Sequence, residues 1–179
     1  MQTTQTAISA HLAVRPDWLA KRREEILEPD LPIIDPHHHL IDRPASGTYL
    51  LPDLLADVAS GHNVVATVYL EWLSMYRADG PEEMRPVGEI EFANGMATMA
   101  ASGGYGKTRV CACIAGHGEL TLGSGVRKVM EAMIVAGGGS FRGIRFIAST
   151  DPDQAEWGAT AVGPGPALHD GGWKASSSI

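Results

Sequence analysis

Apolar residues gather in short runs that alternate with segments of helical spacing. Four runs are predicted as strands, and they cover residues 31–35, 63–72, 108–115 and 141–148. The second run, NVVATVYLEW, is almost entirely apolar and rich in β-branched residues, which is typical of a strand buried on both faces. Because helical segments separate the strands, the pattern predicts an α/β fold with right-handed crossovers and a parallel sheet.

Apolar positions three and four residues apart predict helices over residues 16–27, 52–59, 86–101 and 126–136. A loop containing Pro44, Ser46 and Gly47 is expected before the second of them. Glycines follow the last three helices and fit C-terminal caps. The pair Gly103-Gly104 and the run 137–139 are therefore interpreted as caps, since neither has the spacing of a phosphate-binding loop.

The pattern predicts three segments: an N-terminal extension with a helix (1–30), a partial barrel domain (31–150) and an irregular or disordered tail (151–179). Strand pattern alone leaves two architectures open, a doubly wound open sheet and a (β/α) barrel. A complete eight-stranded barrel takes about 250 residues, and this chain has 179. We therefore expect a truncated half of a longer barrel protein, with a small open α/β domain as the alternative.

Composition excludes several classes of function. The net charge of −7 disfavours a nucleic-acid partner. No stretch approaches the roughly 20 apolar residues of a membrane-spanning helix, and the polar N-terminus lacks the pattern of a secretory signal. The only two cysteines, Cys111 and Cys113, are two residues apart on one strand, which suits buried apolar positions better than a disulfide. A cytoplasmic location without membrane contact is expected.

The clearest chemical motif is IIDPHHHL, residues 33–40. In an extended chain alternate side chains share a face, so His37 and His39 point the same way, together with Asp35. Asp35 is expected to accept a hydrogen bond from a histidine and to orient it. His38 points to the other side and is interpreted as structural. Two imidazoles at the carboxyl end of a parallel strand can take adjacent positions on a divalent metal, with zinc the first expectation. The alternative is a loop of surface histidines.

Three further residues are candidates for substrate binding because they lie near the same edge. Glu71 ends the second predicted strand, and its alternative role is a structural ion pair. Arg145, on the fourth strand, could bind a substrate carboxylate in bidentate fashion or form a salt bridge to a neighbouring strand. His117 follows the third strand, where a helix-capping loop histidine is the competing interpretation.

The motif IIDPHHHL, together with VVATVYLEW and FRGIRF, resembles the amidohydrolase superfamily. The resemblance is to the amidohydrolase-related TIM-barrel group, which includes sugar lactonases and decarboxylases, and it spans residues 15–150. One departure is Ile41, where many members of the group have tryptophan.

The resemblance implies a metal-dependent hydrolase, with His37 and His39 as metal ligands. It implies an acidic small-molecule substrate containing a lactone or another cyclic ester or amide. The catalytic residue would be an aspartate after the eighth strand, in the missing C-terminal half. Some members of the group work without a metal, so a metal-free site is an alternative. The rival functions are a decarboxylase on the same scaffold and an inactive fragment, whose open sheet edge would favour homodimers or aggregation.

Overall fold

A computed structural model describes residues 15–43 and 47–146 of the chain. The tail predicted over 151–179 lies outside these ranges. Residues Arg15–Arg145 form one compact unit, and the elements described below belong to it. No helix within the described ranges is long and apolar enough to cross a membrane.

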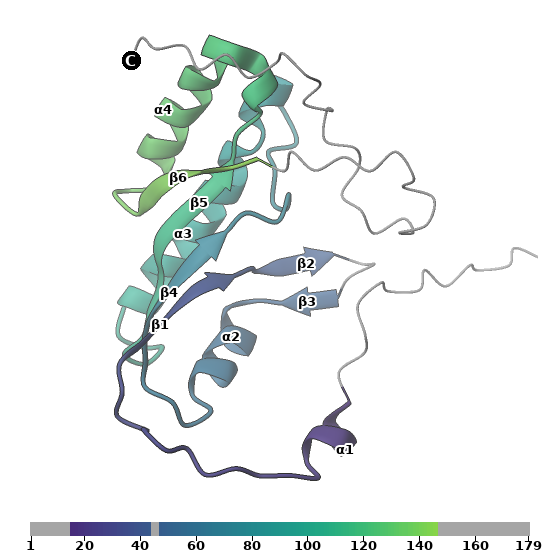
Figure 1. The fold of residues 1–179 in the computed structure, drawn as a ribbon. Helices are drawn as coiled ribbons and strands as arrows, with labels where there is room; N and C mark the ends of the chain where they lie inside the picture. The colour runs from purple at the N-terminus through teal and green to yellow at the C-terminus, as the bar shows by residue number, and fades with distance from the viewer. Residues whose placement is uncertain (1–14, 44–46, 147–179) are drawn as a thin grey trace, which may run out of the picture. The chain divides into compact units, whose positions relative to one another are not determined.

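Four parallel strands make the central sheet. They are β1 (Ile33–His38), β4 (Val64–Leu70), β5 (Arg109–His117) and β6 (Phe141–Arg145), and they lie in the order β1-β4-β5-β6. Figure 1 shows the four arrows side by side and pointing the same way. The predicted α/β fold with a parallel sheet is confirmed. The spatial order follows the chain order without a reversal, so each new strand adds to the same side of the sheet.

Three helices connect the strands: α2 (Leu51–Val58), α3 (Val87–Ala101) and α4 (Val126–Ala136), with short 3₁₀ turns at Glu82–Met84 (η1) and Leu120–Gly125 (η2). Right-handed crossovers between strands in unreversed order place their helices on one face of the sheet. The core is accordingly one cluster joining helices and strands, and its fully buried members include Tyr69, Ile90, Ile114 and Met133.

The two faces of the sheet differ in burial. On β4, Thr67 and Tyr69 are fully buried, whereas alternate positions such as Val68 are only partly buried. Ile34, paired with Ala66 on that second face, is 60% exposed. The prediction that these strands are buried on both faces is therefore wrong for the described part of the chain. The physical reason is that the core formed with α3 and α4, which contact β5 and β6, covers one face of the sheet.

The helix predicted over 16–27 is much shorter. Helix α1 spans only Pro16–Leu19, and none of its residues is buried. Trp18 and Leu19 are 59% and 57% exposed. Helices in proteins gain most of their stability from packing an apolar face, and this segment has no core contact that would extend its first turn.

Strand β1 continues through Pro36, where the sequence predicted a stop. Asp35 and His38 pair with Thr67 and Tyr69, so β1 has one more residue than β4 between these pairs. Such a bulge, on a strand at the edge of the sheet, accommodates a proline that has no N–H to donate. After it, β2 (Ile41–Arg43) and β3 (Gly47–Tyr49) form a small antiparallel pair where only a loop was predicted.

Candidate metal and substrate site

The first and third histidines of the triplet come together at the carboxyl end of β1. Nε2 of His37 lies 3.1 Å from Nε2 of His39. Their ring centroids are 4.9 Å apart and the rings are nearly perpendicular. His37 is exposed and His39 is partly buried. The alternation of side chains that the sequence predicted for this pair is therefore present in the structure.

The orientation of His39 is fixed by its other nitrogen. Nδ1 lies 2.9 Å from the carbonyl oxygen of Leu70, and because a carbonyl only accepts, Nδ1 carries the hydrogen. In the neutral ring Nε2 is then unprotonated and can accept a hydrogen or bind a cation. Burial lowers the pKa of His39, an effect that the bond to Leu70 partly offsets, so the neutral ring is favoured. The ring of Trp72 packs against it with centroids 4.6 Å apart.

His38 points to the covered face of the sheet. Its Nδ1 lies 2.9 Å from the carbonyl oxygen of Val68, and its Nε2 lies 3.6 Å from Sγ of Cys111. Burial raises the pKa of the Cys111 thiol to about 12, so the protonated thiol faces an imidazole nitrogen. Burial also lowers the pKa of His38. These contacts agree with the structural role predicted for this residue.

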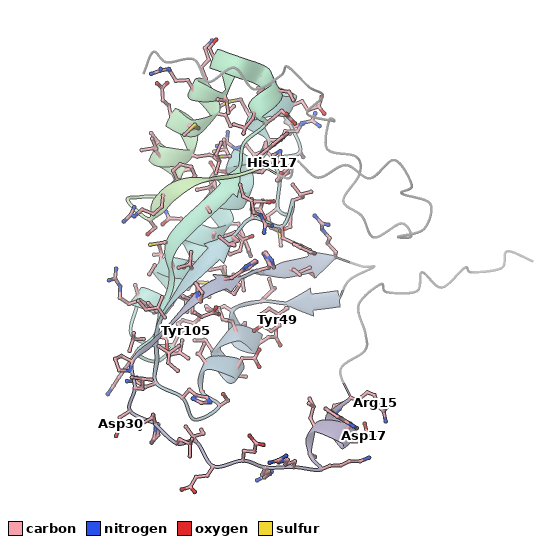
Figure 2. All side chains as sticks on the ribbon, in the orientation of Figure 1. Arg15, Asp17, Asp30, Tyr49, Tyr105 and His117 are labelled. Carbon is pink, nitrogen blue, oxygen red and sulfur yellow. The ribbon has the colours of Figure 1, made fainter. Side chains whose placement is uncertain are left out.

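The hydrogen bond of Asp35 goes to the backbone and not, as expected, to an imidazole. Its charge does act on the ring of His38, where it partly offsets the lowering of the pKa by burial. Its Oδ1 accepts a hydrogen bond from the backbone N–H of His37 at 3.0 Å. The bulge in β1 gives Asp35 the same facing as His38, which explains the difference from simple alternation. A hollow of about 510 Å³ lies beside the histidines. Its far wall comes from β3 and α2, where the hydroxyl of Tyr49 donates to Asp57 at 2.6 Å (Figure 2).

Glu71 and Arg145, two predicted substrate-binding residues, contact each other. Nε of Arg145 donates to Oε1 of Glu71 at 2.8 Å, and a terminal nitrogen donates to the backbone oxygen of Glu71 at 2.6 Å. Glu71 is 0% exposed and the Arg145 side chain is 31% exposed. The structural ion pair left open by the sequence is thus present. Both charges also act on His39: Arg145 lowers its pKa and Glu71 raises it.

His117 is the last residue of β5, where Figure 2 labels it. It pairs in register with Arg145 on β6. The structure thus places it at the same carboxyl edge of the sheet as the histidine pair. It belongs to a different strand, however, and β4 lies between that strand and β1. The sheet brings His117 beside Arg145 rather than beside His37 and His39.

The histidine pair fits two positions around a metal ion. Zinc–imidazole distances near 2.05 Å with tetrahedral angles separate two nitrogens by about 3.3 Å, close to the observed 3.1 Å. The same distance fits a hydrogen bond donated by His37. Among residues 15–43 and 47–146, no group of three or more His, Cys, Asp or Glu side chains is placed to hold one ion. The described part of the chain therefore offers two candidate ligands, whereas a zinc site normally takes at least three from protein.

Comparison of the chain with protein-family models, curated proteins and solved structures finds no match. The motif at residues 33–40 and the geometry around it are accordingly the features that bear on function.

Two residues near this site had no signal in the sequence. Trp72 follows Glu71 and packs on His39. This contact depends on the path that the chain takes after β4, so the sequence pattern did not indicate it. Glu89 lies in the first turn of α3, where an acidic residue is ordinarily a solvent-exposed partner of the helix dipole. In the structure its side chain is 0% exposed and accepts hydrogen bonds from the segment that carries Trp72.

Proposed function

We propose that the sheet is the first half of a (β/α) barrel of the TIM type. The strand order β1-β4-β5-β6 supports this, because a doubly wound sheet reverses direction within its first few strands. The partly exposed second face supports it as well. In a closed barrel that face, with Ile34 and Val68, would line the packed interior.

We further propose that the chain carries part of the active site of a metal-dependent hydrolase of the amidohydrolase-related type. The single observation behind this proposal is the convergence of two Nε2 atoms, 3.1 Å apart, at the carboxyl end of β1. Active sites of (β/α) barrels lie at that end. The bond between His39 and the Leu70 carbonyl leaves Nε2 as the ligand atom, and such orienting partners are usual for metal-binding histidines.

In the proposed reaction, His37 and His39 hold zinc or a similar divalent ion. When bound, the ion supplies Lewis acidity to the substrate carbonyl group. Glu71 holds Arg145 through Nε and one terminal nitrogen. This uses only part of the donor set of the guanidinium, and the remaining donors suit a substrate carboxylate. The resemblance implies a lactone or another cyclic ester or amide, and the arginine favours an acidic one, so an acidic small molecule of this kind is the proposed substrate class.

A second candidate function follows from the incomplete ligand set. Within residues 15–43 and 47–146 no group of three or more His, Cys, Asp or Glu could hold one ion, which leaves His37 and His39 as the only proposed ligands there. The chain by itself would then be an inactive half that binds metal weakly, and activity would need the remaining ligands and the base that the resemblance places after the eighth strand.

Zinc titration of the purified full chain tests the proposal. We expect one bound ion and at least about tenfold weaker binding in His37→Ala and in His39→Ala. His62→Ala is the matched control, because His62 is exposed in the turn before β4, and it should leave affinity unchanged. Equal affinity in all four proteins would reject the site.

Assays with lactones that carry or lack a carboxylate then address the reaction. Hydrolysis restricted to the acidic lactones supports the proposed substrate class. Release of CO₂ from a related acid would instead support a decarboxylase, and metal binding without turnover would support the inactive half.

A further inference from the structure

One carboxylate oxygen of Glu89 accepts hydrogen bonds both from the end of β4 and from the segment that follows it. Its Oε1 accepts hydrogen bonds from the hydroxyl of Tyr69 at 2.8 Å and the backbone N–H of Trp72 at 2.7 Å. It also accepts from the backbone N–H and the hydroxyl of Ser74, at 3.3 and 3.2 Å. The side chain is 0% exposed. A buried carboxylate with this many donors ties α3 to the chain that leaves the strand.

The segment after β4 adopts a backbone that needs such ties. Leu73 and Met75 have φ values of 54° and 55°, in the left-handed region that side chains other than glycine disfavour. Strain of this kind persists only where surrounding contacts enforce it. From the other side, the guanidinium of Arg43 on β2 donates to the backbone oxygens of Trp72 and Leu73. Glu89 and Arg43 thus hold Trp72 by its two backbone polar groups.

Trp72, which these hydrogen bonds hold, is also the residue that packs on His39, one of the two candidate metal ligands. The ring centroids of Trp72 and His39 lie 4.6 Å apart, with an interplanar angle of 36°. His39 is thus confined between this indole and the Leu70 carbonyl. A change in the backbone at Trp72 would free one side of the imidazole.

We propose that Glu89 is a positioning residue: it fixes Trp72 against His39 and thereby orients the imidazole whose Nε2 faces His37. The proposal deepens the metal site and rests on the proposed function for its consequence, although the contact between the two rings exists without a metal. The hydrogen bonds of Glu89 go to Tyr69, Trp72 and Ser74, so its effect on His39 would pass through Trp72.

Two substitutions at Glu89 distinguish a role in positioning Trp72 from a role in merely filling space in the core. Glu89→Leu keeps a side chain of similar size but removes the acceptor, and Glu89→Gln keeps an acceptor oxygen. We expect nuclear Overhauser contacts between the Trp72 and His39 rings in the full chain to be lost in E89L and retained in E89Q. The matched control is Glu91→Leu on the same helix, where Glu91 is exposed and pairs with Arg77, and it should retain them. Contacts retained in folded E89L would overturn the proposal.

Amide hydrogen exchange in the unmodified chain tests the anchor even where E89L does not fold. The amides of Trp72 and Ser74 should exchange slowly because they donate to a buried carboxylate, and exchange as fast as at exposed Asp79 would overturn the proposal. Zinc affinity tests the consequence, with a fall of about tenfold expected in E89L and none in E91L. Failure of the unmodified chain to bind zinc would reject the proposed function, whereas the ring contacts would still decide the role of Glu89.

Discussion

The covered and the open face of the sheet are built from similar apolar residues and perform different tasks. On the covered face, Tyr69 and Ile114 are fully buried under the connecting helices. On the open face, Ile34 is 60% exposed although it belongs to the same kind of strand. Folding free energy comes mainly from the first face, because apolar burial scales with the area removed from water. The second face is the one to which His37 and His39 of the candidate site project.

The histidine triplet repeats this contrast within three residues. His38 pairs in register with Tyr69 and bonds to Val68, so it belongs to the covered face. His37 and His39 project to the other side, where their Nε2 atoms meet. Identical side chains thus meet different surroundings, because the strand turns His38 into the core and leaves His37 exposed and His39 partly buried.

The largest expected effect compares two isoleucines on strands. Ile114→Ala should lower the free energy of unfolding by about 2–5 kcal/mol, because it opens a cavity in the buried core. Ile34→Ala should lower it by less than about 1 kcal/mol, as expected at an exposed position. Urea denaturation of the two variants measures both values, and equal losses would remove the distinction between the faces.

A smaller loss of stability is expected when the ion pair between Arg145 and Glu71 is broken. Arg145→Met should destabilise the chain by about 2–3 kcal/mol, since it leaves buried Glu71 without its cation, and partial exposure of the arginine reduces the loss. Arg77→Met breaks an exposed pair with Glu91 and should change stability by less than about 1 kcal/mol. A double variant with Glu71→Gln should recover part of the first loss. Comparable losses in the two arginine variants would mean that the pair with Glu71 is screened like a surface pair.

The histidine contrast predicts a further difference in stability. His38→Ala removes a buried ring and leaves the Val68 carbonyl without this donor, so a loss of about 1–3 kcal/mol is expected. His37→Ala removes an exposed ring and should change stability by about 0.5 kcal/mol or less. Thermal unfolding without metal measures both, and a larger loss in His37→Ala would contradict the assignment of faces.

The smallest effect is a dependence on pH. Burial raises the pKa of Glu89 above its ordinary value of 4.5, and nearby Glu71 raises it further, against hydrogen bonds from Trp72, Tyr69 and Ser74. A raised pKa means that the folded chain binds the proton more tightly than the unfolded chain. The associated stability is present below pH 4.5 and is lost as the pH rises through the folded pKa. Relative to Glu89→Gln, the unmodified chain should lose stability over that interval, and a constant difference would contradict it.

The elements with strong local patterns could be predicted from the sequence. Helix α4 begins and ends as expected, because its apolar spacing and the following glycine are local signals. The four parallel strands could be placed for the same reason. The barrel closure remains a proposal, since no local signal states how a sheet curves.

The features that the sequence did not predict correctly are those that tertiary contacts determine rather than the local pattern. Helix α1 stops after Leu19 because no core covers its apolar side chains. The bulge at Pro36 changes which way Asp35 faces, and no spacing rule contains it. Glu89 is placed by hydrogen bonds from a segment 15 and more residues earlier in the chain, so the local pattern gave no prediction for it.

Nitrogen-15 NMR of the imidazoles during zinc titration tests the central claim most directly, because it observes each ring nitrogen separately. We predict that Nδ1 of His39 carries the hydrogen before zinc is added. The Nε2 signals of His37 and His39 should then shift together and saturate at one equivalent, while His38 stays unchanged. If zinc moves His38 or His62 instead, or leaves the signals of the pair at their starting positions, the two nitrogens do not form a metal site.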